Sequence, residues 1–223
     1  MRIIPPSHEI LFMPEAGQLL RHIELAGRTC YKSEDKITAD SAAGFVKRII
    51  ASGHHSVIEH ASISVRFICD RGVTHELVRH RLAAFSQEST RYANYSQDKF
   101  GNQITVIRPL FWPQGSPHYQ RWLEAMRQAE EHYLALLAGG ARPQEARAVL
   151  PNSLKTEIVM TANLREWRHV IGLRCSKAAH PQIREIMLPL LEDLHRRLPA
   201  VFDDLYETYR QDIEDLARQV AEL

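Results

Sequence analysis

Residues Ala61 to Asp70 alternate between apolar and polar side chains, and this pattern constrains the fold more than any other stretch of the chain. Ile63, Val65 and Phe67 fall on one face of an extended segment, and the residues between them are polar or charged. A period of two is the pattern of a β-strand with one buried face and one open face. The chain is therefore expected to contain a sheet that packs one face on an apolar core.

Segments on both sides of this strand predict a mixture of strands and helices. Short strands are expected within Met1–Met13, interrupted by Pro5-Pro6, and at Ile104–Ile107 and Ser153–Thr161. Helical spacing predicts helices at Glu15–Thr29, from a Thr38 cap to Gly53, and at Val73–Leu82, His118–Leu137, Gln144–Val149, Leu164–Arg174, Ile183–Leu198 and Val201–Val220. The expected fold class is α+β: mixed helices and a small, mainly antiparallel sheet, with a helix-rich C-terminal half.

The bulk composition sets limits on what the chain can bind. Its 223 residues are enough to bury a sizeable core, and residues 1–223 are expected to form a single domain. The 28 basic and 27 acidic side chains nearly cancel, so no overall field draws the chain to a polyanion. Binding of a nucleic acid polymer is therefore not expected, and any anion must be recognised locally.

Cysteine content and hydropathy bear on the cellular compartment. Cys30, Cys69 and Cys175 are odd in number and far apart, which argues against a disulfide framework and against a metal-binding or redox pair. No stretch approaches the roughly 20 apolar residues that span a bilayer, and the first residues lack the apolar run of a signal peptide. A cytoplasmic protein outside the membrane is expected.

The segment RHRLAAFSQESTRY, Arg79 to Tyr92, holds three arginines, whose planar donors suit phosphates and paired carbonyl edges. A helix over Val73–Leu82 would place Glu76 beside Arg79, where the carboxylate orients the guanidinium. Ser89-Thr90-Arg91 is expected to form a loop whose amides and hydroxyls wrap a phosphate. Spacing alone fits equally well with a solvated basic face that holds a local salt bridge.

A second polar cluster, GHHSVIEH from Gly53 to His60, places three histidines and a glutamate in eight residues. The spacing of His55 and His60 does not match the His-x-x-x-His of helical zinc sites, so no metal ligand is assigned. His54, Glu59 and His60 are expected to form hydrogen bonds, either within a polar site or as plain structural contacts.

A third cluster lies in the segment NLREWRHVIGLRC, Asn163 to Cys175. On a helix, Arg165 and His169 are four residues apart and share a face, while Trp167 lies on another face that is expected to be core. Arg174 ends the apolar stripe. It is either a surface residue whose stem covers apolar neighbours or a charge held at the rim of a pocket.

Five sequence elements occur in an order that is typical of one family. They are H-x-S-x-x-E-H at His54–His60, Arg79-His80-Arg81 followed after seven residues by Ser89, SQES-x-RY at Ser86–Tyr92, ARxVLP at Ala146–Pro151, and N-x-R…LR from Asn163 to Arg174. One short pattern is a weak signal, but five ordered patterns across most of the chain are specific. In these elements the chain resembles the flavin-dependent thymidylate synthases.

The resemblance implies a transferase of nucleotide biosynthesis, a methyltransferase that makes dTMP from dUMP. The one-carbon unit would come from methylenetetrahydrofolate, and the hydride would come from NADPH through bound FAD. The resemblance also implies a homotetramer in which each site is assembled from several subunits.

The resemblance further assigns site residues by motif position. FAD-binding positions are Ser56, Arg79, His80, Arg81, Glu88, Asn163, Leu164, Arg165 and His169. Nucleotide-binding positions are Glu76, Arg79, Ser89, Thr90, Arg91, Arg147 and Arg174. The family often has glutamine where Glu76 stands and asparagine where His169 stands, so the chain departs from its usual residues at these two positions.

The residue types suit flavin chemistry, since flavin carries hydride at N5, which no side chain can do. Arg174 is the expected catalytic residue, because a fixed guanidinium beside the uracil N3–O edge stabilises the electron-rich form of the base. Arg91 and Arg147 would hold the phosphate. Cys175 is not expected to be a nucleophile, because adjacent helical residues such as Arg174 and Cys175 point about 100° apart.

The residues alone are also compatible with two other classes of protein. One is a metal-dependent hydrolase built on His54, His55 and His60, which bound zinc without flavin would support. The other is a nucleotide- or RNA-binding module without catalysis, in which the arginines clamp a phosphate backbone. Few aromatic residues surround the arginines, which weighs against extended binding of nucleic acid.

Overall fold

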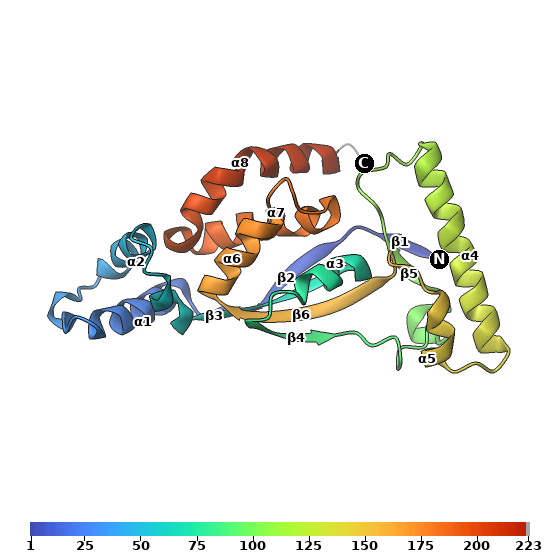
Figure 1. The fold of residues 1–223 in the computed structure, drawn as a ribbon, viewed down its shortest axis with the longest axis horizontal. Helices are drawn as coiled ribbons and strands as arrows, with labels where there is room; N and C mark the ends of the chain where they lie inside the picture. Colours follow the sequence, from blue (N-terminus) through green and yellow to red (C-terminus); the bar gives the residue numbers. More distant parts are fainter. Residues whose placement is uncertain (222–223) are drawn as a thin grey trace.

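A four-stranded antiparallel sheet forms the centre of the molecule in the computed structural model, which describes residues 1–221 (Figure 1). Its strands, in spatial order, are β2 (Ser7–Phe12), β3 (Ser62–Asp70), β6 (Lys155–Asn163) and β4 (Ala83–Gln87). Strands β3 and β6 pair along their whole lengths, from Ser62 opposite Asn163 to Asp70 opposite Lys155. The prediction of an α+β fold with a small, mainly antiparallel sheet is confirmed.

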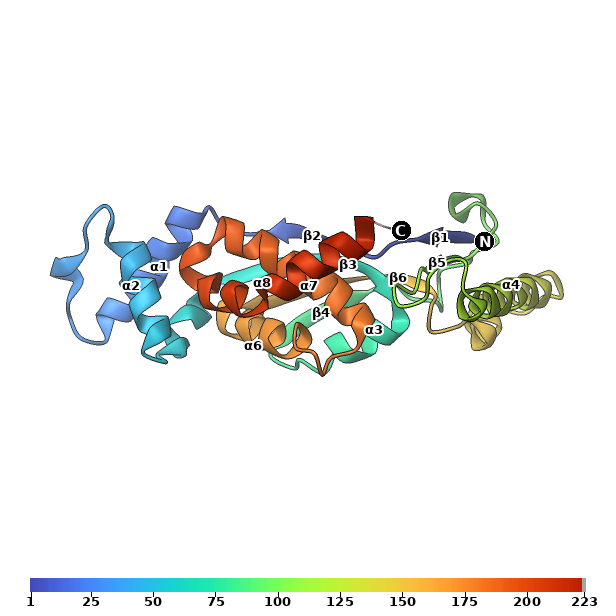
Figure 2. The ribbon, with the colours of Figure 1, turned by 90° about the horizontal axis from the view of Figure 1, so that it is seen from above.

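The alternation in β3 has the predicted consequence for burial. Ile63, Val65 and Phe67 are completely buried, and they belong to the larger of the two apolar clusters. Helices α6 (Leu164–Arg174) and α7 (Pro181–Arg197) supply much of that cluster, and α8 (Pro199–Ala221) packs on α7. Viewed from above in Figure 2, α7 and α8 extend across the sheet. The helix-rich C-terminal half therefore covers one face of the sheet.

A second apolar cluster lies at one end of the long axis, where β1 (Arg2–Ile4) pairs in parallel with β5 (Thr105–Ile107). The long helix α4 (Pro117–Ala138) packs here through Trp122 and Tyr133, next to the short helix α5 (Pro143–Ala146). At the other end lie α1 (Ala16–Thr29) and α2 (Ser41–Ala51), as Figure 1 shows. The elements η1 (Glu34–Lys36), η2 (His55–His60), η3 (Asp98–Phe100) and η4 (Arg147–Val149) are 3-10 turns.

Three details differ from the sequence-based expectations. Helix α3 (Arg71–Leu77) ends at Leu77, so the predicted extension to Leu82 is wrong, because the chain must turn to begin β4. Strand β4 itself was not predicted. Apart from Phe85 its residues AAFSQ are small or polar, and pairing with β6 rather than intrinsic preference makes them extended. The N-cap of α2 is Asp40 rather than Thr38, whose backbone N–H donates to Ser41 Oγ at 2.9 Å.

None of the helices within residues 1–221 combines the length and the apolar character that crossing a membrane requires.

The contact between α1 and α2 depends on Gly27. A Cβ at this position would lie 2.7 Å from Phe45 Cζ and 2.8 Å from Val57 Cγ1. Gly27→Ala is therefore expected to lower the free energy of unfolding by about 1–2 kcal/mol, because the overlap outweighs alanine's better helix propensity. Urea denaturation measures this change in the free energy of unfolding.

Gly44→Ala is the matched control, since only Arg48 Nη1 lies near its added Cβ, at 3.4 Å. This substitution is expected to leave the free energy of unfolding unchanged or to raise it. A Gly27→Ala protein as stable as the parent would contradict the packing argument.

Candidate active site

A cavity of about 780 Å³ opens at the point where strand β6 passes into helix α6. Its lining residues come from η2, from the residue before β4, from the end of β6 and from α6: His55, Glu59, Leu82, Asn163, Arg165, Glu166, Arg168 and His169. Asn163 caps the helix, its Oδ1 accepting a hydrogen bond from the Glu166 N–H at 2.9 Å. This leaves the Asn163 amide NH2 free to donate to a ligand. The prediction that Arg165 and His169 share a face is confirmed, because both line this cavity.

A neighbouring cavity of about 450 Å³ shares His55 and Arg165 with the first one. Ser56 lies in its wall, and its other lining residues come from α1, α2 and the turns that follow them. Arg165 Nη1 donates to Glu59 Oε1 at 2.6 Å where the two cavities meet. Ser56 and the first turn of α6 are therefore brought together, although they are distant in sequence.

The Arg174 guanidinium is held in place by residues far away in the sequence. Its Nε donates to His80 Nε2 at 2.9 Å, Nη1 donates to Glu76 Oε2 at 2.7 Å, and Nη2 donates to the Glu76 carbonyl at 3.1 Å. Glu76 therefore fixes Arg174, and the prediction that it would orient Arg79 is wrong, because Arg79 lies beyond the end of α3. Arginine has five N–H donors, so two of them, one on each terminal nitrogen, stay free for a ligand.

His80 is buried next to these groups, and its ring lies edge-on to that of His169. Burial, the Arg174 charge and His169 lower the pKa of His80 to about 4. The ring is therefore neutral at pH 7. Since Nε2 accepts from Arg174, the ring proton is on Nδ1, which lies 3.6 Å from Glu166 Oε1.

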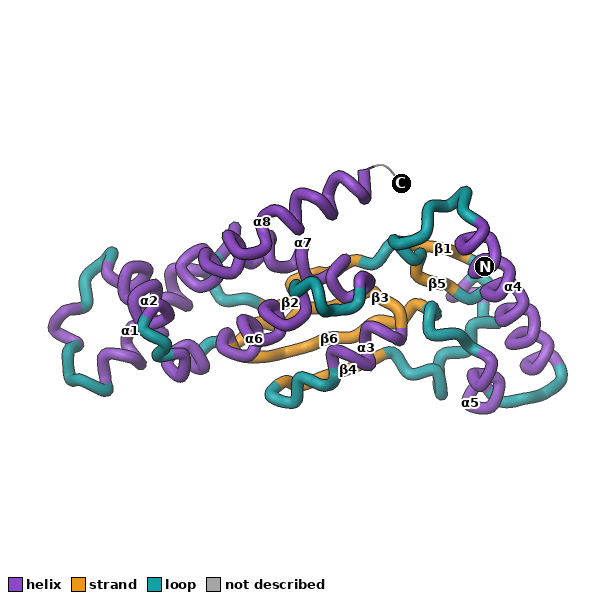
Figure 3. The backbone as a smooth tube through the Cα atoms, turned by 45° about the horizontal axis from the view of Figure 1, so that its top comes forward, coloured by secondary structure: helices purple, strands orange, loops and turns teal. Residues whose placement is uncertain are grey.

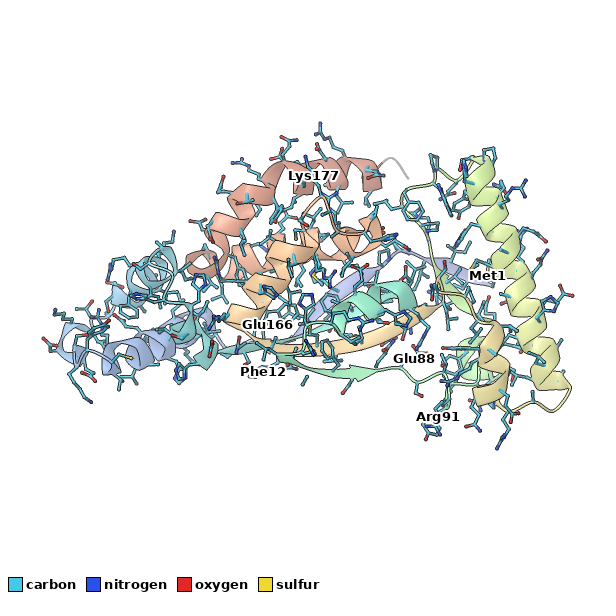
Figure 4. All side chains as sticks on the ribbon, viewed as in Figure 1. Met1, Phe12, Glu88, Arg91, Glu166 and Lys177 are labelled. Carbon is cyan, nitrogen blue, oxygen red and sulfur yellow. The ribbon has the colours of Figure 1, made fainter. Side chains whose placement is uncertain are left out.

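The other end of the arginine segment lies beyond β4, near α5. Arg147 Nη1 donates to Thr90 Oγ1 at 3.3 Å, and the Arg91 N–H donates to Ser89 Oγ at 3.3 Å. Figure 4 shows Arg91 well apart from Glu166 along the long axis of the molecule. These four residues are brought together, but away from the cavity at the start of α6.

The exposed arginines do not form the local salt bridge that a plain basic face would hold. Arg79, Arg81 and Arg91 are exposed, and their guanidinium groups form no ion pair with any side chain of residues 1–221. Their charges are therefore available to an anionic ligand.

Glu88 and Leu164, two of the predicted cofactor-binding residues, do not have side chains in the lining of the cavity at the start of α6. Glu88 accepts from Tyr95 Oη at 3.0 Å and from Lys155 Nζ at 3.1 Å, in the wall of a different cavity of about 550 Å³. Leu164 is completely buried in the larger apolar cluster, so only its backbone can face a ligand.

Among the histidines, His60 packs edge-on against His22. Residues 1–221 contain no group of three or more His, Cys, Asp or Glu side chains placed to hold a metal ion.

Sequence reasoning missed Glu166 and Arg168, which both line the cavity at the start of α6. Asn163 followed three residues later by Glu166 is a capping signature, and it could have placed Glu166 in the first helical turn. Arg168 is held by Asp204 of α8, at 2.6 and 2.8 Å, and no local pattern predicts that contact.

A family model described as "Thymidylate synthase complementing protein" matches residues 16–200 of this chain. The chain belongs to this family. Strands β3, β4 and β6 and helices α3 and α6, which carry most of the site residues, all lie within the matched span of the thymidylate synthase complementing proteins. Figure 3 shows how these strands and helices meet at the centre of the molecule.

Curated relatives agree with the family. A protein of Geobacter sulfurreducens is 34% identical over 198 residues, covering 86% of this chain and 82% of its own. Similar proteins occur in Corynebacterium efficiens, 37% identical over 195 residues (82% of this chain and 78% of that one), and in Mycobacterium tuberculosis, 36% identical over 207 residues (87% and 83%). Each of the three is named flavin-dependent thymidylate synthase.

Cys175 lies next to Arg174, but it is completely buried, and burial raises the pKa of its thiol to about 12. A nucleophilic cysteine needs the opposite environment, one that lowers the pKa and admits the substrate. Cys175→Ala is therefore expected to retain thymidylate synthase activity within about threefold, an estimate for a buried residue that does not take part in the chemistry. An assay of dTMP formation tests this, and trapping of a Cys175 adduct by a 5-fluorinated nucleotide would contradict it.

Proposed function

We propose that this protein is a flavin-dependent thymidylate synthase. In the proposed reaction, dUMP, methylenetetrahydrofolate and NADPH with a proton give dTMP, tetrahydrofolate and NADP⁺, with FAD as the bound redox cofactor. The observation that carries the proposal is the Arg174 guanidinium, which Glu76 and His80 fix so that two N–H groups stay free. A fixed pair of N–H donors suits the carbonyl edge of uracil.

The residues at the start of α6 fit FAD. The two joined cavities present Arg165, His169, Ser56 and the free amide of Asn163, and the exposed Arg79 and Arg81 add charge for a diphosphate. When bound, FAD supplies hydride transfer, which no side chain can perform. The protein's part is to bind and orient it. Glu88 and Leu164 stay in the proposed set, Glu88 through its link to Lys155 and Leu164 through its backbone.

Arg174 would activate the uracil ring. A positive charge held against the N3–O edge stabilises the form that has lost the N3 proton, and this makes C5 more nucleophilic towards the one-carbon unit. The charge does not need to move during the reaction, because Glu76 and His80 fix it beforehand. Preorganised charge of this kind lowers a barrier without reorganisation at the moment of reaction.

Ser89, Thr90, Arg91 and Arg147 would bind the phosphate of dUMP. They form a compact group of hydroxyl and guanidinium donors near α5. The five residues of β4 lie between this group and His80, a span of about 16 Å. We therefore propose that the phosphate-binding residues of one subunit and the FAD-binding cavity of another together form each active site in a homotetramer. In this proposal residues 1–223 act as one domain, and the free cysteines suit the reducing cytoplasm.

One spectroscopic experiment tests this function. The purified protein is expected to be yellow, and anaerobic NADPH is expected to bleach the flavin band, with dUMP changing the rate. Addition of methylenetetrahydrofolate and dUMP should restore the band and form dTMP in an amount equal to the NADPH consumed. A colourless protein with bound zinc would support a hydrolase instead, and a protein that binds dUMP without any flavin would support a binding module.

A further inference from the structure

Glu166 is a buried acid whose carboxylate has no hydrogen-bond donor among residues 1–221. The residue is only 6% exposed, and it lines the cavity at the start of α6. With no donor bound to it, the carboxylate is free to act electrostatically on the nearest polar group. The cationic or ring nitrogen that lies nearest to it is His80 Nδ1, at 3.6 Å from Oε1.

The two nitrogens of the His80 ring have different roles: one accepts a hydrogen bond and the other carries the ring proton. Nε2 faces the Nε–H of Arg174 at 2.9 Å, and arginine stays protonated at any working pH. Nε2 must therefore offer a lone pair, which requires the ring proton on Nδ1. In the other tautomer two N–H donors would face each other, and the guanidinium would have to move away. The tautomer of His80 thus decides whether Arg174 is held.

We propose that Glu166 is a positioning residue, whose carboxylate holds His80 in the Nδ1–H tautomer, so that His80 Nε2 in turn holds the Arg174 guanidinium. A carboxylate that orients a histidine whose other nitrogen acts on a third group is an established arrangement in catalytic and metal sites. At 3.6 Å the contact is electrostatic, and a shift of about 0.6 Å would make it a hydrogen bond.

The neutral state of the ring supports this assignment. Burial, Arg174 and His169 lower the pKa of His80 to about 4, so two tautomers compete at pH 7 and a neighbouring charge selects between them. The polar groups around the ring are Arg174 on one nitrogen, Glu166 on the other and His169 at its edge. Only Glu166 carries a negative charge against a ring nitrogen. Its effect on uracil binding, through Arg174, rests on the proposed function.

The first measurement does not depend on any ligand. Two-bond proton–nitrogen correlation spectra of the protein with ¹⁵N-labelled histidine report the tautomer of each ring at pH 7, and His80→Gln assigns the His80 signal. The wild-type protein is expected to show the Nδ1–H tautomer. Glu166→Met should give a mixture or the Nε2–H form, while Glu166→Gln should keep Nδ1–H because its amide oxygen still accepts. Methionine fills a similar volume, and replacing a buried charge with an apolar group is often tolerated.

The second measurement is binding of dUMP by calorimetry. Glu166→Met is expected to raise the dUMP Kd about tenfold, as for loss of one charge-assisted hydrogen bond, with Glu166→Gln close to wild type. Glu214→Gln on the exposed face of α8 is the matched control and should change neither readout. A wild-type His80 with its proton on Nε2, or a Glu166→Met protein that keeps the Nδ1–H tautomer, would overturn the proposal. Wild-type protein that binds no dUMP would contradict the proposed function alone, since the tautomer is measured without nucleotide.

Discussion

Arg174→Ala is expected to lower kcat by about 10²- to 10³-fold while FAD stays bound, as for removal of a preorganised donor from a developing negative charge. The residue ends α6, at the opposite end of the helix from the cavity that we propose for FAD, and none of the residues lining that cavity depends on it for a hydrogen bond. Removing the guanidinium also leaves the Glu76 carboxylate unpaired. In the proposed site this carboxylate would then repel the electron-rich base. Single-turnover assays with the flavin spectrum as a second readout separate loss of chemistry from loss of cofactor.

Two further variants sharpen this test. Arg174→Lys keeps a charge but not the two paired donors, so it should recover only part of the lost rate. Arg210→Ala removes an exposed arginine of α8 that pairs only with neighbours on its own helix, and it should behave like the wild type. Turnover by Arg174→Ala within about twofold of wild type, a change too small for loss of one charge-assisted contact, would show that Arg174 does not activate the base.

Trp167→Ala is expected to lower the free energy of unfolding by about 3–5 kcal/mol, the range for truncating a buried aromatic side chain. Trp167 is completely buried between α6 and the sheet, its ring lies 6.3 Å from that of Phe67, and its Nε1–H donates to the Ile63 carbonyl at 3.0 Å. The truncation would leave a cavity and an unsatisfied carbonyl. Urea denaturation followed by circular dichroism gives the magnitude.

Trp112→Ala is the matched control, because Trp112 is partly exposed in the loop before α4. This substitution should lower the free energy of unfolding by less than about 1.5 kcal/mol. Trp167→Phe keeps most of the buried area but not the hydrogen bond. Its loss of unfolding free energy should therefore fall between the losses for Trp112→Ala and Trp167→Ala. A Trp167→Ala protein that loses less than about 1 kcal/mol would show that the sheet and α6 close over the gap.

The elements that the sequence predicted correctly are those whose own residues dictate them. The period of two in β3 and the helical spacing of Leu164–Arg174 are local patterns, and both elements have nearly the predicted bounds. Strand β4 has no such pattern and is extended because β6 offers it a partner. Helix α3 stops early for the same reason, since the chain has to reach β4. Strand pairing with residues far away in the sequence therefore determines both the extended conformation of β4 and the end of α3.

The candidate site divides in the same way. The shared face of Arg165 and His169 follows from a four-residue spacing and could be predicted. The contact of Arg174 with Glu76 spans 98 positions, and spacing within one helix placed Glu76 beside the wrong arginine. The sequence does not predict Glu166 as a site residue, because a glutamate three residues after a cap normally serves the helix end, whereas here its side chain lines a cavity.

Strand β4 gives a structural meaning to the number of residues between the Arg-His-Arg triplet and Ser89. Its five residues pair in register with β6, from Ala83 opposite Ala162 to Gln87 opposite Ile158, so hydrogen bonds fix the length of the segment. Inserting one residue would turn every following side chain to the other face and move the Ser89 loop by about 3.3 Å. Side chains in this strand can therefore vary more freely than its length, and insertions or deletions here should be selected against even where no ligand is touched.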